Sequence, residues 1–170
     1  MSDRVSVLWI VLALVAVQRG IELVYAARNT RRLLEAGGVE IGARHYPLFV
    51  LLHASWLVAM AVAVPPHTLP NWWLLGLFAV LQALRVWVVR TLGPYWTTRI
   101  VTVPNAPLVR NGPYRFLRHP NYLVVVGEIA VLPLAFGAVW IALAFSLLNA
   151  ALLVVRTRIE ESALAGRRAL

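Results

Sequence analysis

The sequence contains no cysteine and no lysine, and only seven of its 170 residues are acidic. The absence of cysteine excludes disulfides, thiolate metal sites and cysteine nucleophiles, and we expect no metal centre. Charged residues make up 14% of the chain, whereas 61% of its residues are apolar. A soluble domain has roughly a quarter charged residues. A short chain cannot bury so large an apolar fraction in one core, so the composition predicts an integral membrane protein.

Arginine alone supplies the positive charge of this chain. A formal net charge of +9 would indicate a nucleic-acid partner if the protein were soluble. Here the arginines lie between apolar segments, where cytoplasmic loops and anionic lipid headgroups account for them. We therefore expect contacts with membrane lipid and no nucleic-acid partner.

Apolar segments long enough to be helices follow one another along the chain. There are five: Val5–Ala27, Tyr46–Val64, Trp72–Val89, Tyr122–Gly137 and Ala138–Val155. The first three approach the ~20 residues that a helix needs to cross the hydrocarbon layer. The last two are nearly continuous, but Pro133 and Gly137 supply a break, so we expect a helical hairpin there. The predicted fold is an all-α polytopic membrane protein with about five transmembrane helices.

The distribution of arginine predicts the orientation of these helices. Thirteen of the sixteen arginines lie in segments 28–45 and 90–121 and in the tail from 156 onward, which all fall on one side of the membrane. Arg4 is the only arginine in the segments of the other side. Because cytoplasmic loops are enriched in basic residues, the N-terminus is predicted outside, with the C-terminus and the long loop in the cytosol.

The long loop Leu92–Asn121 differs in composition from an ordinary connection. Its five prolines exclude a continuous helix. Its tryptophan, tyrosine and valine content argues against disorder. Ordered loops of this length are usually functional, so the loop is expected to cover a site.

Polar side chains also occur inside the predicted spans, where an ionisable group is costly unless it is paired or faces water. In the first span they form one helical stripe, with steps of four, three and four residues: Gln18, Glu22, Tyr25 and Asn29. The others are Arg19 in the first span, His53 in the second, Gln82 and Arg85 in the third and Glu128 in the fourth.

A rise of 1.5 Å per residue places all of these groups in the cytosolic half of the bilayer. Two interpretations fit. The groups can be interhelical pairs, Arg19 with Glu22 and Arg85 with Glu128, while His53 bonds a carbonyl. Alternatively they line a polar cavity that opens to the cytosol, and their shared depth favours this cavity.

The most specific motifs lie in the C-terminal half. The run Gly112-Pro-Tyr-Arg-Phe-Leu-Arg-His-Pro-Asn-Tyr122 precedes the hairpin, and Arg156-Thr-Arg-Ile-Glu-Glu161 follows it. This arrangement resembles the isoprenylcysteine carboxyl methyltransferase family and its wider group, which includes phospholipid N-methyltransferases. The resemblance covers about residues 90–165, and the first two spans match only in general character.

The resemblance implies a membrane-embedded enzyme that moves a methyl group from S-adenosylmethionine, leaving S-adenosylhomocysteine, to an oxygen of a lipophilic or prenylated acceptor. It implies one domain over residues 1–170. Residues 1–89 would supply three spans on the substrate side, and residues 90–170 the cofactor-binding loop, the hairpin and the tail. The implied cofactor-binding residues are Leu108, Val109, Tyr114, His119, Pro120, Asn121, Tyr122 and Glu160. Arg156 is implied to face the reacting substrate. The family's histidine before the Leu-Val pair is replaced here by Ala106-Pro107.

The hairpin geometry and the chemistry of the side chains support these cofactor-binding assignments independently of the resemblance. A hairpin brings His119–Tyr122 beside Arg156–Glu161, where Glu160 can pair with an amine and loop amides can bind a carboxylate. Each residue also has a simpler explanation: tyrosines anchor at interfaces, arginines bind headgroups, and neighbouring charges pair on a helix. Their joint order and spacing favours the cofactor site.

The sequence does not determine the chemical identity of the methyl acceptor. A carboxylate needs no base, whereas a phenol or enol must lose a proton and an amine must be neutral. Glu128, buried in a low-dielectric span, is the expected general base, and Arg156 is expected to orient the acceptor oxygen. Prenylcysteine carboxylates, alkylpyrones or alkylresorcinols, and phosphatidylethanolamine all suit a lipid-facing enzyme. The alternatives are a phospholipid N-methyltransferase, or a transporter or scaffold without enzymatic activity. Neither the oligomeric state nor the roles of Arg19, Glu22, His53 and Arg85 follow from the sequence.

Overall fold

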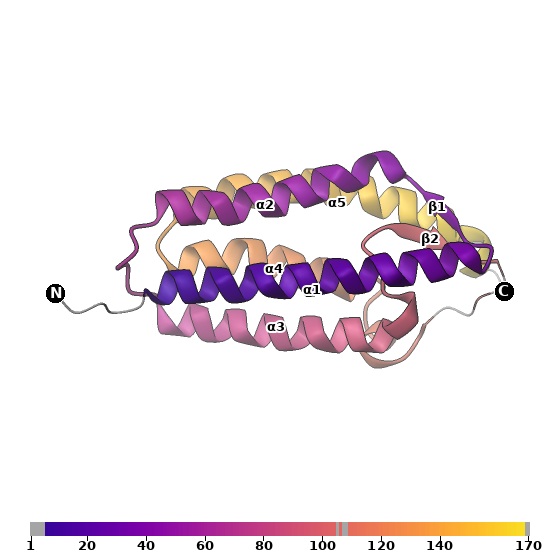
Figure 1. Cartoon of the computed structure of the whole chain (residues 1–170), viewed down its shortest axis with the longest axis horizontal. Coiled ribbons are helices and arrows are strands. Elements are labelled where there is room, and N and C mark those ends of the chain that lie inside the picture. The colour runs from indigo at the N-terminus through magenta and orange to yellow at the C-terminus, as the bar shows by residue number, and fades with distance from the viewer. Residues whose placement is uncertain (1–5, 105, 107–108, 169–170) are drawn as a thin grey trace.

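Five helices run side by side in the computed structural model, which describes residues 6–104, 106 and 109–168, with side chains as far as 163 (Figure 1). They are α1 (Val7–Glu35), α2 (Tyr46–Ala63), α3 (Trp72–Leu92), α4 (Pro120–Ala135) and α5 (Val139–Arg168). Four of the helical segments are long and apolar enough to cross a membrane, and α4 is a shorter apolar helix. The predicted all-α polytopic fold is confirmed, and each predicted segment corresponds to one helix.

Side-chain caps begin two of these helices. The Asn71 side chain accepts hydrogen bonds from the backbone N–H groups of Trp73 and Leu74, at 3.1 and 3.2 Å, and so satisfies donors at the start of α3. Ser6 caps α1 in the same manner through the Trp9 N–H. The backbone N–H of Asn71 also donates to the Ala135 carbonyl at 2.7 Å. This bond ties the α2–α3 connection to the end of α4.

The hairpin between α4 and α5 turns on Gly137, as the sequence predicts. Gly137 has a φ of 72°, a left-handed conformation that glycine adopts without steric cost. The Ala138 N–H donates to the Pro133 carbonyl at 2.9 Å, and the Gly137 N–H donates to Leu134 at 3.1 Å. These two bonds form a Schellman motif that satisfies the last carbonyls of α4. Helix α5 therefore reverses along α4.

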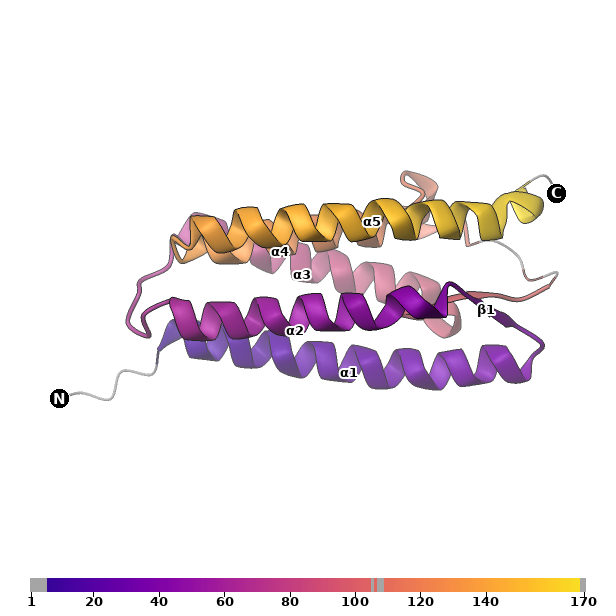
Figure 2. The same ribbon diagram turned by 90° about the horizontal axis from the view of Figure 1, so that it is seen from above.

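The apolar core lies at the end of the bundle near the N-terminus. Helix α4 packs against both α3 and α5, and α5 packs against α2 (Figures 1 and 2). The core combines the first turns of α1, the second half of α2 and most of α4, and its largest buried side chains include Trp56, Met60, Ile129 and Leu132. Many large apolar side chains on the outer faces are exposed, as expected of helices that contact lipid.

Buried charges replace this core farther along the bundle. Arg85 on α3 donates to both carboxylate oxygens of Glu22 on α1 from Nε, each at 2.8 Å. It also lies 3.3 Å from Glu128 on α4, and Arg19 bridges the same two glutamates at 3.0 and 2.7 Å. Gln82 donates to Glu128 at 2.8 Å. We call Arg19, Glu22, Arg85 and Glu128 the ion network; its formal charges balance, and it joins α1, α3 and α4.

The loop between α3 and α4 is ordered mainly by contacts with α1 and with the α1–α2 connection. The Asn29 side chain donates to the carbonyls of Gly93 and Trp96, at 3.0 and 2.9 Å, and so anchors the loop on α1. Two short strands that the sequence analysis did not predict, β1 (Val39–Ile41) and β2 (Ile100–Thr102), pair antiparallel. Arg99 and Glu40 form an ion pair at 2.9 Å beside this ribbon. The loop is not a continuous helix, as the prolines predict.

Removal of one arginine from the ion network should destabilise the fold. Arg85→Leu leaves the carboxylates of Glu22 and Glu128 with one guanidinium between them. Loss of one partner from a buried pair typically costs about 3–5 kcal/mol, so the melting temperature in detergent should fall markedly. The double variant Arg85→Leu/Glu22→Leu keeps the remaining pair balanced and should recover much of the loss.

The matched control is Arg31→Leu, which removes an exposed arginine from an i,i+4 pair with Glu35 on the same helix as Glu22. Exposed pairs contribute little, so its melting temperature should stay near that of the wild type. An Arg85→Leu variant as stable as Arg31→Leu would contradict a structural role for the network.

Candidate functional site

Two cavities meet at the end of the bundle where α1 ends, α4 begins and α5 ends. The first, of about 660 Å³, lies between the α3–α4 loop, strand β2 and the facing ends of α4 and α5, and we call it the loop cavity. The second, of about 340 Å³, lies among the helices and is lined mainly by α1 and α2; we call it the span cavity. The residues that line both cavities are Trp96, Thr97, Asn121, Tyr122 and Arg156. The two cavities therefore adjoin, and we call these five residues the junction.

A chain of hydrogen bonds crosses from the junction into the loop cavity. Arg156 on α5 donates from Nε to the Tyr122 hydroxyl at 2.9 Å, and Tyr122 donates in turn to Glu160. Arg156 also donates to the Thr98 carbonyl at 3.0 Å, which ties α5 to the loop. Because α4 and α5 are antiparallel, the start of one and the end of the other supply adjacent side chains. The sequence predicts this pairing.

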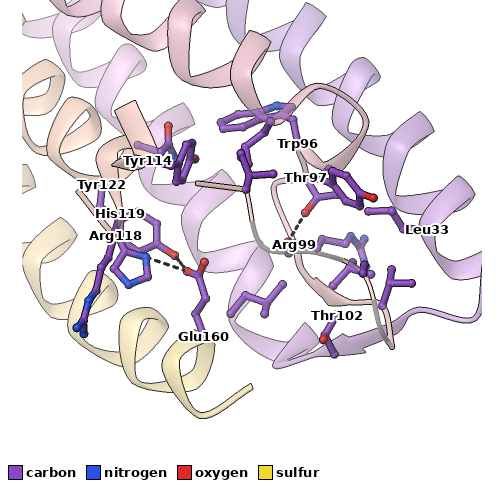
Figure 3. A pocket seen from close by; sticks show the side chains of 18 of the residues that line it. Leu33, Trp96, Thr97, Arg99, Thr102, Tyr114, Arg118, His119, Tyr122 and Glu160 are labelled. Carbon is purple, nitrogen blue, oxygen red and sulfur yellow. Dashed lines mark hydrogen bonds and ion pairs between the residues drawn. The ribbon is translucent and has the colours of Figure 1, made fainter. Parts of the chain in front are cut away.

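His119 completes the polar wall of the loop cavity (Figure 3). Its ring stacks on Tyr122 with centroids 5.0 Å apart and an interplanar angle of 10°. Its Nδ1 lies 3.7 Å from Glu160. Tyr114, in the 3-10 turn Gly112–Arg115, also lines this cavity and is drawn on the same side of Figure 3 as Tyr122. Burial and the negative charge of Glu160 raise the pKa of the Tyr114 hydroxyl, which therefore stays protonated at neutral pH and can donate a hydrogen bond.

Positive charge dominates the remaining lining of the loop cavity. Among the described residues that line it, Glu160 is the only carboxylate, and the arginines are Arg99, Arg110, Arg115, Arg118 and Arg156. Apolar and aromatic side chains share the lining, including Leu33, Leu92, Tyr95 and Val109. One anionic group among several cations, with flat apolar walls, suits a zwitterion attached to an aromatic ring system.

The span cavity has a different character. Helix α1 contributes Ala16, Gly20 and Leu23, and α2 contributes Phe49, Val50 and Ala54. Three ion-network residues, Arg19, Glu22 and Arg85, line its inner side together with His53. Gly20 and Ala54 are exposed, and a Cβ placed on Gly20 would meet no heavy atom within 4 Å. The cavity is thus largely apolar and opens between α1 and α2 toward the lipid-facing surface.

The structure brings most of the sequence-predicted site residues together. Val109, Tyr114, His119, Asn121, Tyr122, Glu160 and Arg156 all line the loop cavity. Pro120 does not line it; it begins α4, the position at which proline is favoured in a helix. Leu108 lies outside the described residues.

Glu128, expected as the general base, lines neither cavity. Its side chain is only 1% exposed, and its two oxygens accept from Gln82, Arg19 and Arg85. It therefore does not reach a molecule in the span cavity in this arrangement. The pairing interpretation agrees with the structure, which contains the Arg19–Glu22 and Arg85–Glu128 pairs and the contact of His53 with the Phe49 carbonyl. The alternative differs from it, because the cavity that Arg19, Glu22, Arg85 and His53 line is largely apolar.

Sequence reasoning missed the junction residues of the loop. Trp96 is buried, and the Arg85 guanidinium lies 5.9 Å from the centroid of its ring. Thr97 follows it and also lines both cavities. Strand β2 also walls the loop cavity, although only the β-branched run Ile100-Val-Thr102 signals a strand, and three residues are too few to predict one.

The comparisons with known proteins agree with this architecture. The model of the isoprenylcysteine carboxyl methyltransferase (ICMT) family matches residues 74–166, which contain the loop, α4 and nearly all of α5. The chain belongs to this family. A protein of Bacillus subtilis (strain 168), YpbQ, is 38% identical over 160 residues, covering 92% of this chain and 95% of its own length. No solved structure matches significantly.

A more distant relative, from Haemophilus influenzae (strain Rd), is 26% identical over 142 residues, which cover 81% of this chain and 83% of that protein. Both relatives are uncharacterized proteins, so neither indicates a substrate for this chain. Membership of the family identifies a multi-pass membrane protein with methyltransferase activity in general.

Members of this family generally use S-adenosylmethionine, so we expect Glu160→Gln to weaken the binding of its product S-adenosylhomocysteine to the purified protein. The change keeps the size of the side chain and an acceptor for the Tyr122 hydroxyl but removes the one negative charge of the loop cavity. A charge-assisted hydrogen bond contributes about 1.5–3 kcal/mol, so we expect a ~10- to 100-fold higher Kd by calorimetry.

The control is Glu35→Gln, the same substitution at an exposed residue at the end of α1 that lines neither cavity. Its Kd should equal that of the wild type. If Glu160→Gln binds S-adenosylhomocysteine as tightly as the wild type, the α-amino group of the ligand does not pair with Glu160.

Proposed function

We propose that the protein transfers a methyl group from S-adenosylmethionine to an oxygen of a lipid-like acceptor, and that the transfer takes place at the junction of the two cavities. The observation that carries this proposal is the shape of the site. A polar, arginine-rich cavity adjoins an apolar cavity that opens to lipid, and five residues are common to both. S-adenosylmethionine supplies an electrophilic methyl group on a sulfonium.

The residues of the loop cavity fit this methyl donor. Glu160 would pair with its α-amino group, and a cavity arginine would bind its carboxylate. The aromatic walls at Tyr95 and Tyr114 suit its adenine. Two buried polar atoms at the junction, Nε1 of Trp96 and Oδ1 of Asn121, have no hydrogen-bond partner among the described residues. Buried polar groups are rarely left unpaired, so they support a bound polar ligand.

The span cavity suits the apolar part of the acceptor. A prenyl or alkyl chain would enter between α1 and α2, where small residues leave the wall open. Its polar end would then lie near Arg156, whose guanidinium would orient or charge-balance the reacting oxygen. Arg156 is held for this task by Tyr122 and the Thr98 carbonyl.

Methyl transfer from a sulfonium is an in-line displacement, and alignment of the two reactants supplies much of the rate. The protein's part is to hold the donor in one cavity and the acceptor in the other, and to exclude water from the junction. Trp96 is 3% exposed and stands where the cavities meet. Its indole would shield the reacting atoms from solvent.

The proposed orientation places the loop cavity in the cytosol and the N-terminus outside. Arginines of the loop and of α5 gather at the end of the bundle that holds the site, and basic residues favour the cytoplasmic side. The methyl donor would then reach the loop cavity from the cytosol, and the acceptor would reach the span cavity from the bilayer.

The test is methyl transfer by purified protein from labelled S-adenosylmethionine to a set of long-chain acceptors, with Ala54→Phe as the diagnostic variant. A phenyl group at Ala54 would fill the opening of the span cavity and leave the loop cavity intact. We expect kcat/KM for the acceptor to fall at least about tenfold, while binding of S-adenosylhomocysteine is retained.

Ala63→Phe makes the same substitution at an exposed position near the other end of α2 and should leave both properties unchanged. Failure of well-folded wild type to bind S-adenosylhomocysteine would overturn the proposal. Transfer to phosphatidylethanolamine instead of any oxygen acceptor would make the enzyme an N-methyltransferase.

A further inference from the structure

His53 on α2 faces the span cavity with a defined tautomer. Its Nδ1 lies 2.8 Å from the carbonyl oxygen of Phe49, one turn earlier in the same helix. A carbonyl can only accept a hydrogen bond, so Nδ1 carries the proton of the neutral ring. This leaves Nε2 with a lone pair, and no described residue bonds it. His53 therefore presents a proton acceptor to whatever occupies the cavity.

His53 lines the same cavity as the junction residue Arg156, so its Nε2 can act on a molecule bound there. The Arg156 guanidinium lies 5.1 Å from the centroid of the Phe49 ring. His53 follows Phe49 by four residues, or about 6 Å along the helix axis. Arg156 and His53 both line the span cavity. An acceptor oxygen held by Arg156 would thus share the span cavity with the imidazole of His53.

We propose that His53 is the general base of the reaction, and that the acceptor is a hydroxyl compound, a phenol or enol that carries a long apolar chain. This inference rests on the proposed function and narrows its substrate class. A carboxylate acceptor is already ionised and gains nothing from a base. A phenol with a pKa of ~10 is almost entirely protonated at neutral pH, so a base beside its oxygen accelerates the attack.

The proton and electron balance is complete with the methyl donor alone. The hydroxyl proton passes to Nε2 of His53 as a lone pair of the oxygen forms a bond to the methyl carbon. The carbon–sulfur bond breaks, and its electron pair stays on sulfur. The products are a methyl ether, S-adenosylhomocysteine and an imidazolium, which loses its proton to solvent before the next turnover.

The other ionisable groups of the span cavity already have partners. Arg19, Glu22 and Arg85 bond to one another and to Glu128, and Arg156 bonds Tyr122 and the Thr98 carbonyl. The hydroxyl of Tyr122 is bonded to Glu160, and Tyr46 lies beside the Arg99 guanidinium. Of the groups that face this cavity, His53 is thus the one whose geometry leaves a basic atom available.

The experiment compares wild type with His53→Gln and His53→Asn on three acceptors of equal chain length. They are a pentadecylphenol, a pentadecyl-dinitrophenol (below, the nitrophenol) that is ionised at neutral pH, and a pentadecylbenzoate. General-base catalysis contributes about 10²- to 10⁴-fold, so both variants should lose that factor in kcat on the phenol. On the nitrophenol they should stay close to wild type, because its oxygen has already lost its proton.

Calorimetric titration with S-adenosylhomocysteine shows that each variant is folded and keeps the loop cavity. The matched control is His67→Gln, because His67 is exposed in the α2–α3 connection at the other end of the bundle. It should retain wild-type rates on every acceptor.

Equal losses on the phenol and the nitrophenol would overturn the proposal, since a merely structural histidine gives that result. Full activity of both variants on the phenol would overturn it as well. If the wild type binds S-adenosylhomocysteine but methylates only the benzoate or an amine, His53 is not a general base for a hydroxyl acceptor. The proposal that the protein is a methyltransferase is then retained. If wild type binds no S-adenosylhomocysteine, the proposed function itself fails.

Discussion

The buried ion network is the constraint on which the rest of the structure depends. Two arginines and two glutamates lie inside a bundle surrounded by lipid, where an unpaired charge is costly. Their bonds can form only if α1, α3 and α4 are at one separation and one register. Three of its four residues, Arg19, Glu22 and Arg85, also line the span cavity, and the Arg85 guanidinium lies 5.9 Å from the centroid of the Trp96 ring at the junction. Balanced buried charges thus fix the walls of the site as well as the packing of the helices.

The site combines a polar cavity with an apolar one, and different parts of the chain form each. Residues after the third span supply the polar cavity through the loop and the antiparallel ends of α4 and α5, whereas the first two helices supply most of the apolar cavity. Arg156, Tyr122 and Glu160 form one bonded chain between these surfaces. A ligand at Glu160 and a ligand at Arg156 would therefore be positioned relative to each other by the same side chains. This division agrees with the family match, which covers residues 74–166 and leaves the first two helices out.

The sequence predicts the helices, and it predicts that the residues of the two C-terminal motifs lie close together, because hydropathy, Pro133, Gly137 and the motifs act locally. The stripe on the first span is confirmed for Gln18, Glu22 and Asn29, while Tyr25 is partly exposed. Contacts between distant segments could not be predicted. The β1–β2 ribbon pairs residues about 60 positions apart with three residues in each strand. The position of Glu128 outside both cavities depends on which side chains reach it across the bundle, and helical periodicity does not determine that.

The most direct measurement is a crystal structure of the protein with S-adenosylhomocysteine. We expect the amino acid moiety of the ligand at Glu160 and its adenosine against the loop side chains. The sulfur should lie at the junction, facing the span cavity beside Arg156, Trp96 and Asn121. A ligand in the span cavity, or a sulfur directed away from Arg156 into the cytosolic opening, would contradict methyl transfer between the two cavities.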